Sequence, residues 1–570
     1  MKNLSCFSRG LSGALLLIML LASATIRAQA PSWQAAYVGS GGVVNETVPD
    51  GNGNVYLLGG FSSMTFSFGG LTFQNGDTHS PGAEIFLIKW NTATNTAVWG
   101  LQSRGMGGSI NATGLAVSGT SVYVTGVIFG SRTFGGTTIA NAKQVVFIDK
   151  LTDAGTSASS TWAQYITPAA TSNYSLTPLG KKSAVAVSGA NVYLAGQFKG
   201  TVSLGATTMV SNGGGAGGTD GFLAKLVDAG ASSSVVWAQS FGGTGDEVTQ
   251  TLALSGTDLY VGGWFEGTDV IGTTSLTNAG GRDGYVAKFV DAGTTGTFAW
   301  ASSMGGTAAD EVVSVAANSA GAYVTGHFTT AAAAGTTSLT SAGLRDGFVG
   351  KLAAADGRFV WSKSFGGAGF ETVGGLAVLG ANVYASGTFA GPASFGTTTL
   401  TSTGQYDIFV ARLTDAGPTS AFAWVQQVGC PSYNPASNTV SVTPAAVLYV
   451  GGTCGSGSVF GTISPAGTGA FIASITDAAA LATKSADALG AWQLYPNPAH
   501  AHVVMQLPAV AGAATLTLLD ALGRPVRTEA LALSAVGQRH DLDLTGLPAG
   551  LYAVRVQAGG STATRRLVVE

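Results

Sequence analysis

Short runs in which apolar and polar residues alternate with a period of two make up most of this chain. Between residues 249 and 304 four such runs follow one another, TQTLALS, DLYVGGWF, GYVAKFV and FAWASSM, each bounded by Gly, Asp, Ser or Thr. Runs of this length and period predict β-strands separated by turns. No helical period of apolar residues competes with them, so the pattern predicts an all-β fold.

The four runs form a unit that returns along the chain. A tryptophan in the last run marks each copy, at intervals of 61 to 75 residues: Trp33, Trp99, Trp162, Trp237, Trp300, Trp361 and Trp424. Four-stranded units that repeat in this way pack radially around an axis. We therefore expect a seven-bladed β-propeller with four-stranded blades.

The two ends of the repeat are complementary. Residues 31–38, PSWQAAYV, form a lone tryptophan run, and the last unit ends at its third run, GAFIASI (469–475). Joining the two completes a seventh blade, which an open stack of repeats would not need. We expect the N-terminal strand to close the last blade of a propeller that spans residues 31–478.

An acid and a base five residues apart recur in the third run, as in RDGYVAKF (282–289) and YDIFVARL (406–413). Residues five apart in a strand point to opposite faces, so the two groups of one copy cannot meet. A cation in a packed strand is costly unless it is paired. We expect the bases Lys89, Lys150, Lys225, Lys288, Lys351 and Arg412 to pair structurally with the recurring glutamates Glu247, Glu311 and Glu371. The aspartates of the DAG motifs that follow (153, 228, 291 and 415) are expected to shape turns.

Antiparallel order places the long segment between the second and third runs on the same side as the GGTGDE connection to the next unit. This side, the loop face, carries most of the loop length and loop variation. Function tends to reside on such loops. We expect a ligand to bind there.

Composition and the N-terminus narrow the function classes. Only 10% of residues are charged and the net charge is −3, which argues against nucleic acid, because that partner needs clustered Lys and Arg. Lys2 and Arg9, an apolar run from Leu11 to Ala24 and a small-residue site at 28–30 predict a signal peptide over residues 1–30. An uncleaved anchor is the alternative, but the run is shorter than the roughly 20 residues of a membrane span.

Two short features of the sequence raise the question of a disulfide and of a bound metal ion. Cys430 and Cys454 lie in the seventh unit, and an exported chain meets an oxidising compartment, so we expect a disulfide, with two buried thiols as the alternative. DGNGN (50–54) begins like a calcium loop but lacks its glycine and glutamate. An Asx-stabilised turn is favoured over a weak calcium site, and no cofactor is expected.

Catalytic motifs are equally sparse. GGGAGG (213–218) precedes a strand rather than a helix and favours a flexible loop. His79 and His327 lack metal-binding spacing. Paired carboxylates for glycoside cleavage stay open, with Asp246 and Asp310 as candidates. Because no polar cluster stands apart from the repeat positions, we expect a protein that is not an enzyme.

The repeat resembles the SBBP-type β-propeller repeat family. The runs that carry the resemblance are DGNGNVYLLGGF (50–61), ANVYLAGQF (190–198) and YDIFVARL (406–413), together with the tryptophan runs. The resemblance covers about residues 31–478 and implies the propeller fold. It says little about activity, because that family is largely defined by structure.

After a linker at 479–487 the repeat stops, and short alternating runs with Pro and Gly turns predict a small β-sandwich over 488–570. This region resembles the type A sorting domain of the type IX secretion system of Bacteroidota, with an accessory Ig-like domain as the alternative. The matching residues are Tyr495, Pro496, Asn497, Pro498, Asp520, Gly523, Gly546, Gly550, Leu551, Tyr552, Arg565 and Arg566.

That resemblance implies export to the periplasm, passage across the outer membrane by the type IX machinery and removal of the domain by a sortase-like protease. The cargo is then attached to surface lipopolysaccharide or released. We expect a secreted or cell-surface scaffold for binding or adhesion, whose extracellular ligand is a glycan or a protein. The alternatives are a polysaccharide-acting hydrolase or lyase and a structural surface-layer component.

Overall fold

The computed structural model describes residues 30–76, 82–105, 108–168, 185–212, 218–432, 435–482, 492–507, 512–520, 524–533, 538–558 and 561–570. Within these ranges the chain is all-β apart from one short helix, α1 (Ala478–Ala482), which is too short to cross a membrane. The predicted signal peptide before Ala30, His79, Gly523 and most of GGGAGG lie outside the described residues.

Seven four-stranded antiparallel units follow one another. Unit 1 consists of β3 (Val43–Pro49), β4 (Asn54–Phe61), β7 (Glu84–Asn91) and β8 (Thr96–Gln102). Unit 2 consists of β9 (Gly108–Ser118), β10 (Ser121–Phe134), β11 (Thr137–Asp153) and β12 (Ala158–Pro168). Unit 3 consists of β13 (Val185–Ser188), β14 (Asn191–Phe198), β17 (Asp220–Asp228) and β18 (Ser233–Phe241).

Units 4 and 5 consist of β19 (Glu247–Ser255), β20 (Asp258–Phe265), β23 (Asp283–Asp291) and β24 (Gly296–Gly306), and of β25 (Glu311–Asn318), β26 (Gly321–Phe328), β29 (Asp346–Leu352) and β30 (Phe359–Gly367). Units 6 and 7 consist of β31 (Thr372–Leu379), β32 (Asn382–Phe389), β35 (Asp407–Asp415) and β36 (Ser420–Gly429), and of β37 (Ala436–Val442), β38 (Val447–Cys454), β40 (Thr468–Thr476) and β1 (Trp33–Val38).

The first strands of the units form a closed ring. Each contacts the first strand of the next unit, and β37 of unit 7 contacts β3 of unit 1. At that last junction the Asn438 side chain donates to the Val44 carbonyl oxygen over 3.1 Å, and the hydroxyls of Thr47 and Thr439 lie 3.2 Å apart. The sheets and their closed order resemble β-propeller folds.

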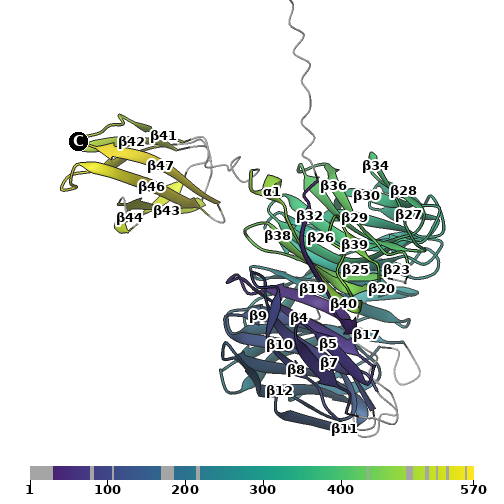
Figure 1. Ribbon diagram of the computed structural model, residues 1–570. Coiled ribbons are helices and arrows are strands. Elements are labelled where there is room, and N and C mark those ends of the chain that lie inside the picture. The colour runs from purple at the N-terminus through teal and green to yellow at the C-terminus, as the bar shows by residue number, and fades with distance from the viewer. Residues whose placement is uncertain are drawn as a thin grey trace, which may run out of the picture.

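The N-terminal strand closes the last unit, as the sequence predicts. β1 pairs antiparallel with β40, with Trp33 opposite Ile475 and Val38 opposite Phe471, and the N-terminal strand runs among the late strands in Figure 1. Trp33 is buried against Phe460, with 5.4 Å between the ring centroids. The apolar face of a strand from one end of the chain thus supplies core to the other end.

The long segments between second and third strands are not the plain polar loops that the sequence suggested. Most contain a short hairpin: β5 (Thr65–Phe68) with β6 (Leu71–Gln74), β15 (Thr201–Leu204) with β16 (Thr207–Val210), β21 (Thr268–Ile271) with β22 (Thr274–Thr277), β27 (Ala331–Ala334) with β28 (Thr337–Thr340), and β33 (Pro392–Phe395) with β34 (Thr398–Thr401). β27 pairs with β24 of the preceding unit, and β39 (Val459–Phe460) pairs likewise with β36. At the ring's seam, β2 (Ser40–Gly41) links β40 to β5. The hairpins therefore cover the outer strand of the unit before them.

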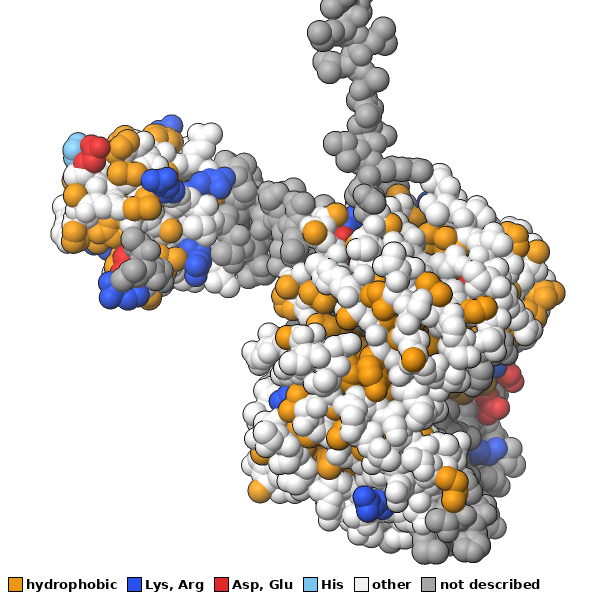
Figure 2. All heavy atoms as spheres, viewed as in Figure 1, with side chains coloured by type: hydrophobic (Ala, Val, Ile, Leu, Met, Phe, Trp, Pro, Cys, Tyr) orange, Lys and Arg blue, Asp and Glu red, His pale blue; other side chains and the backbone are white. Residues whose placement is uncertain are grey.

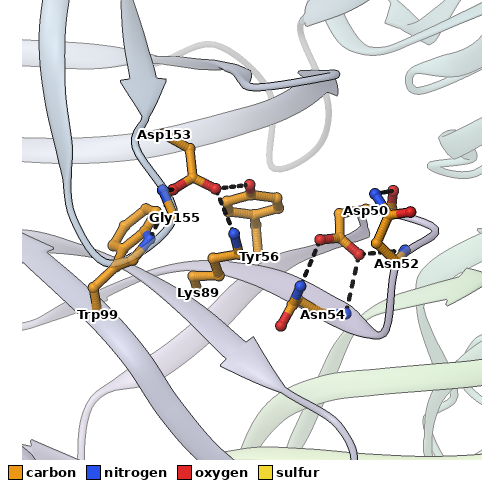
Figure 3. Close-up of polar contacts among 8 residues, drawn as sticks. All are labelled: Asp50, Asn52, Asn54, Tyr56, Lys89, Trp99, Asp153 and Gly155. Carbon is orange, nitrogen blue, oxygen red and sulfur yellow. Dashed lines mark hydrogen bonds and ion pairs between the residues drawn. The ribbon is translucent and has the colours of Figure 1, made fainter.

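The aspartate of the DAG turn joins each unit to the one before it. Figure 3 shows the first case, in which the Asp153 carboxylate accepts from Tyr56 Oη (2.6 Å), Lys89 Nζ (2.6 Å) and Trp99 Nε1 (3.0 Å), all from unit 1. The backbone N–H of Gly155 in its own turn donates over 2.8 Å. We call this arrangement the aspartate clip.

The clip recurs with the same geometry. Its cation and carboxylate are Lys150 and Asp228, Lys225 and Asp291, Lys351 and Asp415, each pair 2.6 Å apart, and Arg412 and Asp477, 2.8 Å apart. The prediction that these bases pair with Glu247, Glu311 and Glu371 is therefore wrong. The base points along its strand away from the loop face, so it reaches the turn at the opposite end of the next unit.

Two junctions between units lack the aspartate clip, and in each the loss of the carboxylate is compensated. Ala354 replaces the aspartate between units 4 and 5, and its carbonyl oxygen accepts from Lys288 (2.9 Å) and Trp300 (3.1 Å). Asp258 of unit 4 supplies the missing charge at 2.7 Å from Lys288. At the closing junction Ser474 stands at the lysine position and Thr92 at the aspartate position. A buried ion lost on one side alone would stay unpaired, so the two are replaced together.

The C-terminal region forms two small antiparallel sheets. One contains β41 (Gln493–Tyr495), β42 (His502–Leu507) and β45 (Gln538–Asp543), and the other contains β43 (Gly512–Leu519), β44 (Pro525–Leu533), β46 (Gly550–Ala558) and β47 (Ser561–Val569). Side chains from both sheets, among them Val503, Leu516 and Val554, form one hydrophobic core.

Candidate functional site

The strand register places the loop face where the sequence predicted it. Glu247 at the start of β19 lies opposite Phe265 at the end of β20, which lies opposite Asp283 at the start of β23. The connection between units and the segment between second and third strands therefore leave from the same end of the sheet.

Most acids at this end are structural. Asp220, Asp283, Asp346 and Asp407 start the third strands, and each accepts a backbone N–H from the segment that leads into its strand, at 2.8–3.0 Å. Glu247, Asp310 and Glu371 lie before or at the start of the first strands and are fully buried. Asp310 accepts from Gly306 N at 2.7 Å and Glu371 from Gly367 N at 3.2 Å. These acids therefore hold the connecting loops rather than present a catalytic pair.

The two sets of acids crowd one another. A Cβ on Gly242 would lie 2.7 Å from Asp220 Cγ and 2.8 Å from Glu247 Oε2, so only glycine fits between them. Burial first, then the charge of Asp269, raises the pKa of Glu247 to about 9, and burial raises the pKa of Asp269 to about 7. Glu247 is therefore protonated at neutral pH.

The sequence places Glu311 among the recurring glutamates with Glu247 and Glu371. The strand register shows that this prediction is wrong. Glu247 lies opposite Phe265, whereas Glu311 lies opposite His327, one residue before the equivalent phenylalanine. Asp310 is the true counterpart of Glu247, and it holds the connecting loop by accepting from Gly306 N and Thr329 N. The other candidate, Asp246, accepts from Thr219 N at 2.8 Å and has a structural role as well.

Glu311 instead anchors a polar and aromatic cluster on the loop face of units 4 to 6. Its carboxylate accepts from Gln250 Nε2 at 3.0 Å and Arg282 Nη2 at 3.4 Å, and it lies against His327 Nε2. Burial would raise the pKa of Glu311, but the His327 and Arg282 contacts outweigh it and hold the pKa at about 2. Glu311 is therefore ionised and accepts hydrogen bonds only.

This ionisation fixes the role of His327. Its ring is buried, which lowers its pKa, and the ring is neutral at neutral pH. To bond an ionised Glu311, His327 must carry its proton on Nε2 and donate it. Nε2 then has no lone pair for Arg345 Nη1, which lies 3.4 Å away.

Arg345 is left without a hydrogen-bond acceptor among the described residues. Its backbone is fixed beside Phe370, because Glu371 N donates to the Arg345 carbonyl oxygen at 2.9 Å. Its guanidinium lies 5.7 Å from the centroid of the Phe370 ring. Burial lowers the pKa of Arg345, which is consistent with a charge that the protein compensates only in part.

Arg345 and Phe370 line a groove of about 410 Å³ that extends over units 5 to 7, where Ala436 of β37 borders it, and which we call the Arg345 groove. Thr372, Thr388 and Tyr406 complete its polar lining. Phe370 is 41% exposed, so one side of its ring is open to a ligand. The volume is within the range of small-ligand sites, roughly 300–1,000 Å³.

The sequence contained a signal for this cluster that the repeat obscured. Trp264, His327 and Thr388 occupy the same position before the last residue of the second strand, and Arg282, Arg345 and Tyr406 the same position before the third-strand acid. These positions differ from unit to unit, whereas structural positions recur. The expectation that no polar cluster stands apart from the repeat is wrong.

The remaining predicted sites have structural roles. Cys430 and Cys454 are buried free thiols, so the predicted disulfide is not formed and the alternative holds in this structure. The Asp50 carboxylate accepts from Asn52 N (2.7 Å), Asn54 N (3.0 Å) and Asn54 Nδ2 (2.7 Å), as Figure 3 shows. This is the Asx-stabilised turn, since donors rather than free oxygens converge there.

The predicted sorting-motif residues cluster at one end of the C-terminal sheets. The Asn497 side chain donates to the Arg566 carbonyl oxygen (2.8 Å) and accepts from Val568 N (2.9 Å), which ties the Tyr495–Pro498 segment to β47. Tyr552 Oη donates to the Pro548 carbonyl oxygen at 2.9 Å, near the Gly550 that starts β46. Gly546 has a φ of +81°, which favours glycine in that turn.

Residues 493–570 match the family model described as the secretion system C-terminal sorting domain. The C-terminal region is a type IX secretion sorting domain. The protein is therefore delivered to the cell surface or the exterior, and its partners include the type IX secretion machinery.

The rest of the chain is compared through structure. No curated protein matches the sequence. Quinohemoprotein alcohol dehydrogenase from Comamonas testosteroni is similar at a TM-score of 0.38 and 11% identity, over 78% of this chain and 77% of that one. The phage phi92 endosialidase is similar at 0.34 and 10%, over 94% and 87%. At such TM-scores these similarities carry no argument about function.

Proposed function

We propose that the protein is a seven-bladed, SBBP-type β-propeller that acts outside the cell as a non-catalytic scaffold for binding or adhesion. The observation that carries the proposal is the Arg345 groove, where a cation without a hydrogen-bond acceptor among the described residues shares one opening on the loop face with an exposed aromatic ring. The buried acids and bases described above have structural partners, and Figure 2 shows few charged side chains over the visible face of the ring.

The electrostatics of the groove favour binding over catalysis. A glycosidase of the usual kind needs a carboxylic acid whose pKa is raised so that it can protonate the leaving group. Glu311, whose hydrogen-bond partner His327 lies beside Arg345, has a pKa of about 2. Three acids with raised pKa values on this face, Glu247, Asp310 and Glu371, are fully buried and hold the connecting loops. The hydrolase or lyase and the surface-layer component remain the rival functions.

The sorting domain supports the place of action. We infer that a sortase-like protease removes the C-terminal domain after export and that the propeller is then attached to surface lipopolysaccharide or released. We expect the cut in the linker at 479–487, whose first residues belong to α1 and whose remainder lies outside the described residues.

The test is a binding array of glycans and matrix proteins probed with the full exported chain, followed by product analysis of every bound glycan. We expect saturable binding without any change in glycan length. Degradation of a bound glycan would support the enzyme instead, and self-assembly without any ligand would support the surface-layer component.

A further inference from the structure

The Arg345 groove combines three kinds of group within one opening. Arg345 supplies a guanidinium, Phe370 an exposed ring face, and Thr372, Thr388 and Tyr406 supply hydroxyls. Such a set of a few polar groups around an aromatic surface is typical of small-ligand sites.

The guanidinium of the groove favours an anion. The Glu311 carboxylate bonds to Gln250, Arg282 and His327, so its charge acts on Arg345 from a distance and, among the described residues, does not pair with it directly. A guanidinium presents a planar fork of N–H donors that matches a carboxylate or an oxyanion of sulfur or phosphorus. An anionic group on the ligand would supply the acceptor that the described protein atoms do not.

The neighbouring groups narrow the class of anion. The Phe370 face offers apolar contact to a ring, and the threonine and tyrosine hydroxyls can both donate to and accept from ligand hydroxyls. A compact inorganic anion would use Arg345 alone. A polyhydroxylated ring that carries an acid uses all of the groups.

A second guanidinium beside an aromatic ring occurs one unit earlier, with its ring supplied from another position of the repeat. Arg282 lies 4.8 Å from the ring centroid of Trp264, at the positions equivalent to Arg345 and to His327. Its side chain is 35% exposed. A ligand with several acidic sugar residues that starts at Arg345 in unit 5 would therefore meet a second guanidinium, that of Arg282, in unit 4.

We propose that the Arg345 groove binds an acidic saccharide, with the acid group on Arg345 and the sugar ring against Phe370. The inference rests on the proposed binding function and assigns its ligand class. It requires that the acid group and the sugar ring both contribute to affinity. Neither a neutral sugar nor a polyanion that contains no sugar should bind as well.

The experiment measures affinity by calorimetry with the full exported chain and its variants. The probes are oligogalacturonate, which is carboxylated, chondroitin sulfate oligosaccharides, which are also sulfated, neutral laminarin oligosaccharides and poly-glutamate. Arg345→Gln is expected to weaken binding of an acidic oligosaccharide about tenfold or more, and Phe370→Ala about fivefold. Lys363→Gln, which removes an exposed cation from β30, is the matched control and should leave binding unchanged.

Binding of either acidic oligosaccharide with this variant pattern supports the proposal, and a preference between the two tells which acid group Arg345 accepts. Equal binding of laminarin, preference for poly-glutamate, or no binding of any probe overturns it. If the array finds a ligand whose binding ignores Arg345 and Phe370, the proposed function stands and this inference fails. Phe370→Ala keeps the test valid should Arg345→Gln unfold, because Phe370 is 41% exposed and its loss removes little of the core.

Discussion

The aspartate of each DAG turn contributes far more than the shape of the turn. Asp415 accepts from Tyr323, Lys351 and Trp361 of unit 5 and from Gly417 in its own turn. Its pKa is lowered, since these donors outweigh the burial that would raise it. The clip therefore joins two units through one carboxylate. The three donors of unit 5 all use this carboxylate as a hydrogen-bond acceptor.

Removal of that carboxylate should be costly. We predict that Asp415→Ala lowers the free energy of unfolding by about 3–5 kcal/mol, because it leaves Lys351 buried and unpaired. The double variant Lys351→Ser with Asp415→Thr copies the closing junction and should lose less. Urea unfolding measures both, with exposed Asp356→Ala as the control, and an Asp415→Ala curve that overlays the control would contradict the role of the clip.

Glu247 and Glu311 should affect stability with opposite dependence on pH. The pKa of Glu247 rises from 4.5 to about 9 on folding, so the native state keeps a proton that the unfolded state releases, and stability falls as pH rises through that window. We predict that Glu247→Gln gains stability over the wild type by up to about 1.4 kcal/mol per pH unit as pH rises through that window.

Glu311 has its pKa lowered to about 2, so its contribution is present above 4.5 and is lost as pH falls toward 2. The penalty of Glu311→Gln should therefore be constant at neutral pH and shrink in acid. Thermal unfolding across pH measures both variants. Parallel pH profiles for the two would show that one of these carboxyl groups is wrongly assigned.

At the scale of the element, the four main strands of each unit were predictable from the sequence. The short hairpins that pack against the outer strands were not. Runs such as DLYVGGWF alternate and are bounded by turn residues, so they identify second strands without a structure. The hairpins β21–β22 and β27–β28 are four residues per strand and look like polar loop. Gly272, with a φ of +60°, marks the turn of one of them, and the recurring GTT motif was the signal that the sequence offered.

The ring as a whole depends on a pairing between residues from opposite ends of the chain. Ala36 of β1 is the register partner of Ala473 of β40. We predict that Ala36→Cys with Ala473→Cys forms a disulfide, raises the melting temperature and speeds migration on a non-reducing gel, because the cross-link closes a very long loop. Ala36→Cys alone is the control for the thiols of Cys430 and Cys454, and thiols that stay free in the double variant would contradict closure.

The sequence alone determined the strands, the count of seven units, the closing role of the Trp33 strand and the sorting domain. These follow from local alternation, from periodicity and from a motif, each of which is written in neighbouring residues. The partners of Lys225 and its equivalents, the separate role of Glu311 and the Arg345 groove were decided only by the tertiary structure. A one-residue difference in register turns Glu311 away from the repeated set, and side chains about 65 residues apart meet only when units pack, so neither is visible in any short stretch of sequence.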